Sequence, residues 1–308
     1  MSDISLHNIT KTYEKGHITA VENVSFEVNK GELFGLIGPD GAGKTSILRM
    51  LTTLLLPDGG HASVNGLDVV RDYKIIRNRI GYMPGKFSLY QDLTVEENLN
   101  FFATLFNTSI EENYNLIKDI YVQIEPFKNR RAGKLSGGMK QKLALCCALI
   151  HKPVVLFLDE PTTGVDAVSR KELWEMLKSL KKENITILVS TPYMDEANLC
   201  DRIALIQSGK IMLIDTPANI VNAYGDNLYS VKSNDRKKLL HDLKNFENVR
   251  SCFSFGEYLH FTLQKDGPDF LKRLETSMKE KNHSPIEIKQ IRPTIEDCFI
   301  KLMSEENK

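Results

Sequence analysis

The feature that most constrains the fold of this chain of 308 residues is the segment GPDGAGKT at residues 38–45. The apolar stretch ELFGLI precedes it, and a helical pattern, SILRMLTTLL, follows it. Glycines allow a turn in which several backbone N–H groups face inward, and the positive N-terminal end of a helix adds to their attraction for anions. The pattern G-x-x-x-x-G-K-[ST] between a strand and a helix therefore predicts a phosphate-binding loop, the P-loop.

Two side chains of this P-loop carry the predicted chemistry. Lys44 is expected to neutralise the β- and γ-phosphates of a nucleotide, and the hydroxyl of Thr45 is expected to ligate Mg²⁺. The alternative is a plain glycine-rich turn between a strand and a helix. The residues expected to bind the nucleotide are Gly38, Pro39, Asp40, Gly41, Ala42, Gly43, Lys44, Thr45 and Ser46.

A continuous apolar run, VVLFLDE at residues 154–160, ends in two acids. Unbroken apolar character is typical of a parallel strand that is covered on both faces, and we expect this strand to be the neighbour of the P-loop strand. Asp159 is then placed to hold Mg²⁺. Glu160 is, with Lys44, a catalytic candidate, because a carboxylate can polarise a water that attacks the γ-phosphate. An ordinary acidic strand end is the alternative.

The segment LSGGMKQKL at residues 135–143 begins a helical pattern and has two interpretations. Ser136 is a favourable N-cap residue for the helix. Ser136, Gly137 and Gly138 at a helix N-terminus would also suit an anion. The residues alone leave both interpretations open.

Taken in order, GPDGAGKTS, LSGGMKQKL and LFLDEPTTGVD resemble the ATP-binding subunit of an ABC transporter, and the resemblance covers residues 4–217. It implies an α/β P-loop NTPase fold with an antiparallel β subdomain and a helical subdomain at about 90–150. The ATP-binding domain is expected to span residues 1–219. ATP and Mg²⁺ are the implied cofactors.

In this family two ATP-binding subunits pair head to tail, and each ATP lies between the P-loop of one subunit and the LSGGM of the other. The resemblance therefore implies that Ser136, Gly137 and Gly138 contact the ATP of a second ABC ATPase chain. The loop 163–166 falls where the family crosses the dimer seam. Tyr13 falls where the family stacks an aromatic ring on adenine, although it also reads as a partly buried strand residue.

Residues 220–308 read as strand, helix, two strands, helix, strand and helix, which predicts a small C-terminal α+β domain with an accessory or regulatory role. Within it, IRPTIEDCF at 291–299 resembles the end of ATP-binding subunits that serve drug, antibiotic and polysaccharide exporters. This second resemblance implies integral membrane permease subunits on separate chains.

Two positions depart from the family pattern. Gly85 stands where the family has a glutamine that reaches Mg²⁺ and the attacking water, and Pro192 stands where it has a histidine that contacts the γ-phosphate. We expect Pro192 to begin a helix that Ser190 or Thr191 caps, since proline is favoured at the first helical position. Both departures predict ATP binding with slow hydrolysis at this chain's own P-loop, within an unequal pair of ATPase chains.

The expected function is the ATP-binding subunit of a multisubunit ABC exporter. The alternatives are a soluble ABC-type ATPase that acts on ribosomes and an interaction subunit that binds ATP without hydrolysing it. Basic and acidic residues both number 40, which argues against a nucleic-acid partner. No apolar run approaches the roughly 18 residues of a membrane span. The first eight residues are polar and mixed, which does not suggest a signal peptide. The five cysteines form no CxxC pair, so we expect no disulfide and no zinc site. We therefore expect a cytoplasmic protein, peripheral on the inner face of the membrane.

Overall fold

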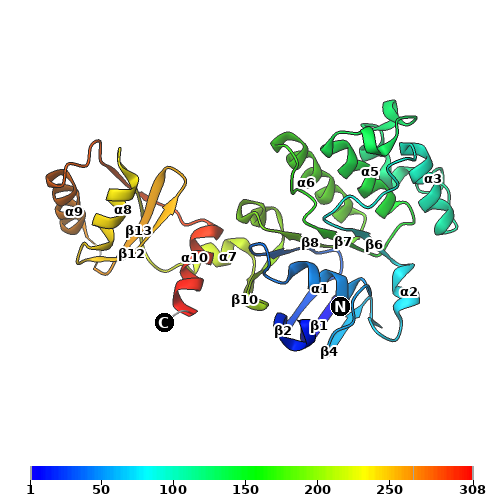
Figure 1. Cartoon of the computed structure of the whole chain (residues 1–308), viewed down its shortest axis with the longest axis horizontal. Coiled ribbons are helices and arrows are strands. Elements are labelled where there is room, and N and C mark those ends of the chain that lie inside the picture. Colours follow the sequence, from blue (N-terminus) through cyan, green and yellow to red (C-terminus); the bar gives the residue numbers. More distant parts are fainter. Residues whose placement is uncertain (1, 266, 307–308) are drawn as a thin grey trace. The chain divides into compact units, whose positions relative to one another are not determined.

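The computed structural model describes residues 2–265 and 267–306, and the chain divides into two compact units. The first unit ends at Ala218 and the second begins at Asn219. Figure 1 follows the chain through both units, with the first in blue to green and the second in yellow to red. Each unit is described by itself.

The first unit is built around a six-stranded sheet. Its strand order is β10 (Lys210–Asp215), β9 (Arg202–Gln207), β3 (Leu33–Ile37), β8 (Thr186–Thr191), β7 (Val155–Asp159) and β6 (Ile80–Met83). Neighbours from β9 to β6 are parallel, whereas β10 is antiparallel to β9. Every residue of β3, β7 and β8 is buried, as expected for parallel strands with both faces covered.

This strand order corrects one expectation. The acidic strand β7 is not the neighbour of the P-loop strand β3, because β8 lies between them. Ser190 of β8 is paired with Leu36 of β3 on one side and with Asp159 of β7 on the other. The expectation failed because β7 and β8 are both fully buried apolar runs, so composition does not say which of them pairs with β3.

A second, antiparallel sheet completes the layers of the first unit. Its order is β2 (Ile18–Asn29), β1 (Ser2–Tyr13), β4 (Gly59–Val64) and β5 (Leu67–Asp68). Buried Val24, Phe26 and Val28 alternate with exposed residues along β2, which is the period of a strand with one buried face. These side chains share one core with β3 and with α1, including the stacked rings of Phe26 and Phe34. The antiparallel β subdomain expected from the resemblance is present.

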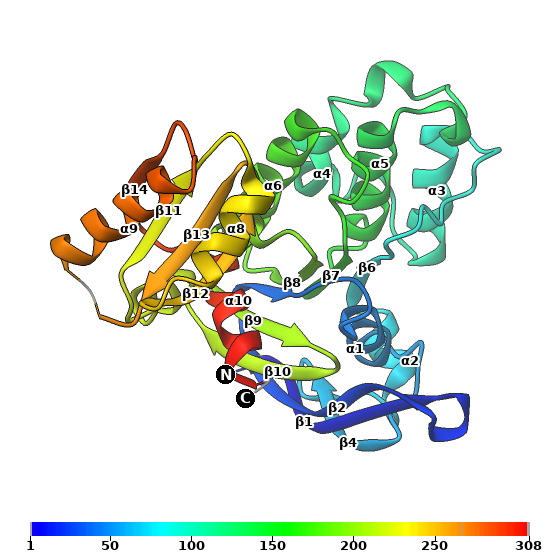
Figure 2. The ribbon, with the colours of Figure 1, turned by 60° about the vertical axis from the view of Figure 1, so that its left-hand side comes forward.

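The α-helices of the first unit are α1 (Lys44–Leu51), α2 (Tyr73–Arg77), α3 (Val95–Leu105), α4 (Tyr114–Tyr121), α5 (Gly137–Leu149) and α6 (Ala167–Lys182), and α7 (Pro217–Asn222) spans the boundary between the two units. Thr94 begins α3 with a capping box, because its hydroxyl accepts from the Glu97 amide while the Glu97 carboxylate accepts from the Thr94 amide. Figures 1 and 2 show α1 on one side of the strands β6, β7 and β8, and α5 on the other.

Among the described residues, the second unit contains most of α7, one antiparallel four-stranded sheet and three further α-helices. The elements follow one another as β11 (Leu228–Lys232), α8 (Arg236–Lys244), β12 (Val249–Phe255), β13 (Tyr258–Leu263), α9 (Pro268–Glu280), β14 (Glu287–Ile291) and α10 (Ile295–Glu306). The sheet order is β12, β13, β11, β14. Its core joins Phe261 and Leu259 of β13 to Leu239 of α8 and Leu274 of α9.

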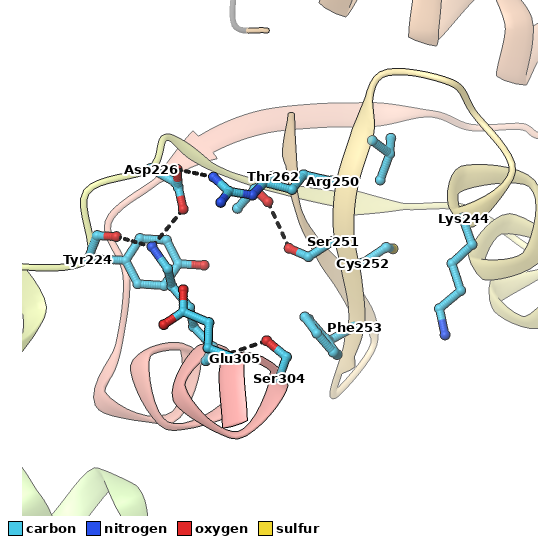
Figure 3. Close-up of a pocket in the computed structure, with 12 residues that line it drawn as sticks. Tyr224, Asp226, Lys244, Arg250, Ser251, Cys252, Phe253, Thr262, Ser304 and Glu305 are labelled. Atoms are coloured by element: carbon cyan, nitrogen blue, oxygen red, sulfur yellow. Dashed lines mark hydrogen bonds and ion pairs between the residues drawn. The ribbon is translucent and has the colours of Figure 1, made fainter. Parts of the chain in front are cut away.

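A cleft of about 390 Å³ lies within the second unit (Figure 3). Arg250 and the Nζ of Lys301 both pair with Asp226, at 3.1 and 2.7 Å. Ser251 and Thr262 share a hydrogen bond of 2.7 Å on neighbouring strands. These polar groups therefore satisfy one another and tie α10 to the segment before β11.

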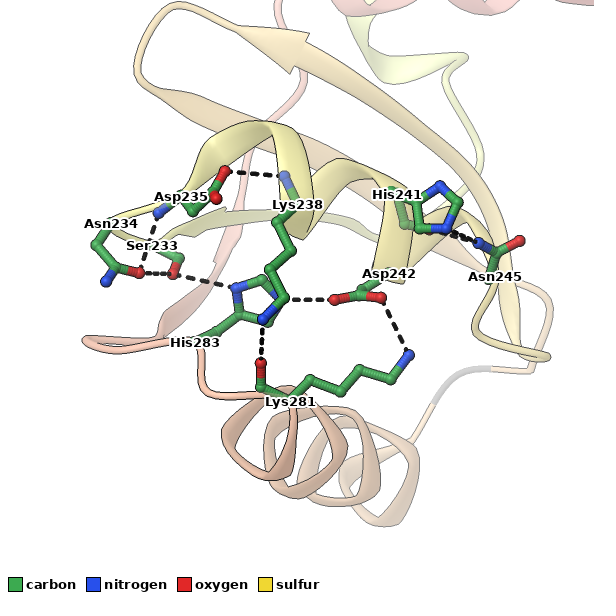
Figure 4. Close-up of polar contacts among 9 residues, drawn as sticks. All are labelled: Ser233, Asn234, Asp235, Lys238, His241, Asp242, Asn245, Lys281 and His283. Atoms are coloured by element: carbon green, nitrogen blue, oxygen red, sulfur yellow. Dashed lines mark hydrogen bonds and ion pairs between the residues drawn. The ribbon is translucent and has the colours of Figure 1, made fainter.

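A buried imidazole joins three segments of the same unit (Figure 4). Nε2 of His283 lies 2.8 Å from Oδ2 of Asp242 on α8, and its Nδ1 lies 3.5 Å from the Ser233 hydroxyl after β11. The hydrogen bond to His283 is the main reason that the pKa of Asp242 lies below its usual 3.8, against the opposing effect of burial. The second pair, His260 and Asp297, connects β13 to α10 at 2.7 Å.

The Asp242 carboxylate should make the second unit sensitive to acid. Its lowered pKa means that its stabilising effect is complete above about pH 4 and is lost as pH falls through the folded-state value. We expect Asp242→Asn to cost about 1.5–3 kcal/mol at pH 7, the usual contribution of a hydrogen bond to a charged group. Urea unfolding followed by circular dichroism from pH 7 to pH 2 measures both effects.

Glu280→Gln on the surface of α9 is the matched control, because Glu280 is an exposed carboxylate of the same unit. It should unfold as the wild type does at every pH. An Asp242→Asn variant with wild-type stability at pH 7 would contradict the structural role of this pair.

Candidate nucleotide-binding site

The P-loop connects the end of β3 to the start of α1, and two of its glycines have no room for a side chain. A Cβ on Gly38 would lie 2.2 Å from the Ile206 carbonyl oxygen, and one on Gly43 would lie 2.3 Å from the Ala20 carbonyl oxygen. Gly43 also has φ of 103°, a left-handed conformation that favours glycine. Close backbone packing therefore fixes the shape of the loop.

Lys44, the first residue of α1, is 3 % exposed and lies among oxygen atoms. Its Nζ donates to the carbonyls of Gly38 at 2.8 Å and Pro39 at 3.0 Å, and it lies 3.0 Å from Oε1 of Glu160. A cavity of about 150 Å³ is lined by Gly41, Gly43, Lys44, Thr45, Ser46, Ala20 and Glu160. The structure thus brings together both catalytic candidates and most of the loop.

Asp159 ends β7 beside the first turn of α1. Its Oδ1 accepts from the Thr45 hydroxyl at 3.1 Å and from the Ser190 hydroxyl at 2.8 Å. A hydroxyl oxygen and a carboxylate oxygen are hard ligands that suit Mg²⁺, which is commonly held by one or two carboxylates together with phosphates and waters. The described residues contain no group of three or more His, Cys, Asp or Glu that would form a cage for a metal.

Glu160 directly follows β7 with φ of 50°, which is uncommon for a residue with a side chain. Its amide donates to both the carbonyl and the hydroxyl of Ser190, each at 3.0 Å. This unusual backbone turn directs its carboxylate to Lys44.

Tyr13, at the end of β1, is half-buried, and its hydroxyl lies 3.1 Å from the Ser46 hydroxyl. The predicted adenine-stacking residue is therefore next to the start of α1. Asp40 and Gly41 are exposed at the tip of the loop, whereas Ala42 is buried.

The LSGGM segment lies elsewhere in the unit. Ser136 is the N-cap of α5, and its hydroxyl accepts from the Met139 amide at 3.4 Å. A Cβ on Gly138 would lie 2.5 Å from the Ser169 hydroxyl, and one on Gly137 would lie 3.7 Å from the Gly164 carbonyl oxygen. The start of α5 thus packs beside the loop before α6 and the first turn of α6, and Figure 2 shows it apart from α1.

The two departures from the family pattern have different surroundings. Gly85 is exposed, and a Cβ there would lie 3.0 Å from the Asp159 carbonyl oxygen, so a side chain would need a small shift of the loop. Pro192 follows β8 directly, and the next helix is a 3-10 turn that begins only at Met194. The expectation that Ser190 or Thr191 caps a helix starting at Pro192 is therefore wrong.

The side chains of Ser190 and Thr191 bind other groups instead of capping a helix. The partner of Thr191 belongs to a polar cluster that the sequence did not predict. Glu196, 2 % exposed, accepts from the hydroxyls of Thr191 at 2.5 Å and Thr162 at 3.1 Å. Its other oxygen pairs with Arg170 of α6 at 2.9 Å. This buried carboxylate joins the end of β8, the loop after β7 and the start of α6. The sequence YMDEANLCD at 193–201 carries no mark that separates the buried Glu196 from the exposed Asp195 beside it.

The chain matches the ABC transporter family over residues 21–163. The probable multidrug ABC transporter ATP-binding protein YbhF of Escherichia coli K12 is 38% identical over 305 residues, which are 97% of this chain and 52% of YbhF. The chain therefore spans about half the length of that relative. The doxorubicin resistance ATP-binding protein DrrA of Mycobacterium tuberculosis is 32% identical over 317 residues, covering 98% of this chain and 94% of DrrA. The chain belongs to the ABC transporter family, among its ATP-binding proteins.

Solved structures agree with this assignment. A dimeric bacterial ABC transporter cassette matches with a TM-score of 0.63 and 28% identity, over 69% of this chain and 98% of the cassette. A post-hydrolysis dimer of that cassette with ADP and phosphate has a TM-score of 0.63 and 27% identity, with the same coverage. They confirm the predicted ABC cassette fold of the P-loop NTPase class. Among the residues that the structure describes, no helix is long and apolar enough to cross a membrane.

The buried pair of Arg170 and Glu196 should contribute measurably to stability. We expect Arg170→Met to lower the free energy of unfolding by roughly 1.5–3 kcal/mol, because the carboxylate stays buried and loses its charged donor. The matched control is Lys171→Met, whose exposed partner Glu175 lies 3.9 Å away and should contribute less than about 1 kcal/mol. Urea denaturation of the full chain compares the two, and equal losses would contradict the role of the buried pair.

Proposed function

We propose that the chain is the ATP-binding subunit of a multisubunit ABC exporter and that it binds Mg-ATP at the P-loop. The observation that carries the proposal is the convergence of Lys44 on Glu160 and of Thr45 on Asp159 around one cavity. A cation, a carboxylate and two hard oxygen ligands at a helix N-terminus are the components that phosphoryl transfer to water requires. Family membership and the exporter names of the relatives YbhF and DrrA support the exporter assignment.

Each residue has a proposed role in binding or hydrolysis. Lys44 leaves the loop carbonyls and neutralises the β- and γ-phosphates, while the loop amides and the α1 N-terminus bind their oxygens. Thr45 and Asp159 hold Mg²⁺, which neutralises charge between the phosphates. Glu160 orients a water toward the γ-phosphate and accepts its proton. Tyr13 stacks on the base.

We propose that a second ABC ATPase chain supplies the opposite half of each site. The Ser136, Gly137 and Gly138 segment then contacts the ATP of the partner. The packing of Gly137 against the loop before α6 and of Gly138 against the first turn of α6 supports a shared surface of the two segments. Hydrolysis at this chain's own P-loop is slow, because neither Gly85 nor Pro192 provides a polar side chain beside the γ-phosphate.

An apolar groove of about 340 Å³ supports docking of a membrane permease. It lies between β6, the segment after it and the helices α3 and α5, and it includes Tyr82, Leu89, Phe102 and Phe106. His151 stacks on Phe106 with centroids 3.8 Å apart, and burial lowers the pKa of its imidazole, so the groove is uncharged there at pH 7. The proposed occupant is a short helix of a separate permease.

The groove also adjoins the candidate nucleotide site. Tyr82 belongs to β6, next to β7, and burial followed by the negative charge of Asp159 raises its pKa to about 12. A permease helix in the groove would therefore contact β6, the direct neighbour of the strand β7 that ends in the acids. The proposal includes a location of the subunit at the inner face of the membrane, where the permease would bind it. The proposed domains are 1–219 and an accessory domain at 220–308.

A non-hydrolysing interaction subunit is the second candidate function, and Pro192 is the observation that favours it. Glu160 and its contact with Lys44 favour the hydrolysing subunit instead. The names of the relatives mention different exported compounds, so the exported substrate is left outside the proposal.

A histidine at position 192 would test whether Pro192 is the reason for the proposed slow hydrolysis of ATP. We expect the wild-type chain alone to hydrolyse ATP below about 1 s⁻¹, the lower end of ordinary enzyme turnover. Pro192→His should raise this rate at least about tenfold, since a positioned polar group typically contributes 10²–10⁴. Phosphate release assays measure both. Pro192→Ala controls for loss of the proline ring and should stay slow, whereas a fast wild type would contradict the proposal.

Permease docking can be tested at the edge of the groove. Leu54 lines it and is 57 % exposed. We expect Leu54→Asp to reduce the membrane-bound fraction about tenfold or more when the chain is co-expressed with its permease, because a carboxylate would lose its hydration against an apolar helix. Val122→Asp, at an exposed apolar residue outside the groove lining, is the matched control. Quantitative immunoblots of membrane fractions give the readout, and equal loss in both variants would contradict docking at the groove.

A further inference from the structure

We propose that Ser190 is a positioning residue, which holds the Asp159 carboxylate and the Glu160 backbone in place from the strand between them and the P-loop. This inference rests on the proposed function of the site. Neither the P-loop pattern nor the acidic strand end includes Ser190, and its role follows from the observed order of the strands.

The position of Ser190 in the sheet makes it a bridge. It lies opposite Leu36, two residues before the P-loop begins at Gly38, and opposite Asp159, the last residue of β7. The carboxyl ends of parallel strands meet at one edge of a sheet, so β8 separates the phosphate-binding loop from the acids. The side chain at this position of β8 is therefore beside both halves of the site.

The hydroxyl of Ser190 makes one hydrogen bond as a donor and one as an acceptor. It donates to Oδ1 of Asp159 at 2.8 Å, and it accepts from the Glu160 amide at 3.0 Å. Ser190 is 0 % exposed, so no solvent competes for these bonds. One hydroxyl thus orients the carboxylate proposed to hold Mg²⁺ and supports the left-handed backbone of the catalytic candidate.

In the described part of the chain, the two residues after Ser190 make no side-chain hydrogen bond to Asp159 or Glu160. Thr191 donates to Glu196 at 2.5 Å, and Pro192 has no donor. The Glu160 amide keeps a second bond, to the Ser190 carbonyl at 3.0 Å, when the hydroxyl is removed. Loss of the hydroxyl should therefore loosen the Asp159 carboxylate more than the backbone.

A loosened carboxylate should weaken the metal and leave metal-free nucleotide contacts intact. Partners that orient a metal ligand typically contribute 10–100-fold in metal affinity. We expect Ser190→Ala to raise the Mg²⁺ concentration that gives half-maximal binding of a fluorescent ATP analogue about tenfold or more. Binding of the same analogue in EDTA should stay within about twofold of the wild type, because Lys44 and the loop amides are unchanged.

A matched pair of larger variants separates hydroxyl loss from altered packing. Ser190→Thr and Ser190→Val have nearly the same shape, and only Thr keeps the hydroxyl. Both branch the Cβ atom at the same buried position with one added methyl group, and Val also has a second methyl group in place of the hydroxyl. We expect Ser190→Thr to keep a Mg²⁺ dependence near that of the wild type and Ser190→Val to shift as Ser190→Ala does. The electron paramagnetic resonance spectrum of Mn²⁺ bound with nucleotide should change only in the Ala and Val variants.

The full chain is used throughout, and circular dichroism confirms that each variant is folded; if Ser190→Val does not fold, Ser190→Ala and Ser190→Thr carry the comparison. Wild-type Mg²⁺ dependence in the Ala and Val variants, or equal shifts in the folded Thr and Val variants, would overturn the role of Ser190 alone. A wild-type chain whose nucleotide binding equals that of Lys44→Ala, with or without Mg²⁺, would overturn the proposed function and this inference with it.

Discussion

The parallel pairing of β3, β8 and β7 is the constraint on which the rest of the first unit depends. It places the carboxyl ends of three buried strands at one edge, where the P-loop, Ser190 and the two acids follow in adjacent positions. Because these strands are fully buried, their polar ends must find partners within the protein. Asp159 finds Thr45 and Ser190, and Glu160 finds Lys44. The candidate site thus lies at the end of a buried sheet, where the polar side chains hydrogen-bond or form ion pairs with one another.

Glu196 extends the same principle away from the P-loop. A carboxylate that is 2 % exposed is costly to bury, and here two hydroxyls and one guanidinium compensate it. Its partners Thr162, Thr191 and Arg170 lie on three separate segments around the loop 163–166. A displacement of that loop would therefore change the contacts of Glu196 with Thr191 at the end of β8, which is beside the candidate site. In the proposed pair of chains, this cluster would connect the loop expected at the dimer seam to the candidate nucleotide site of the same chain.

The second unit depends on a different set of contacts. Its apolar core is small, and polar clusters around Asp226 and the two histidine–aspartate pairs join its helices to its sheet. Asp297, in the first turn of α10, accepts from the amide and hydroxyl of Thr294, which precedes the helix, and also pairs with His260 of β13. The segment IRPTIEDCF, read in the sequence as a family resemblance, thus has a structural function in this unit.

The sequence by itself determined the class of fold, the strand and helix pattern, the P-loop and the acidic strand end. These are local signals, because periodicity, glycine spacing and apolar runs act over a few residues. Only the tertiary structure decided that β8 separates β3 from β7, that Ser190 bridges them, that Glu196 is a buried junction and that Pro192 starts no helix. Strand order and side-chain partners depend on contacts between residues far apart in the chain, and two equally apolar strands carry no local mark of which neighbour each will take.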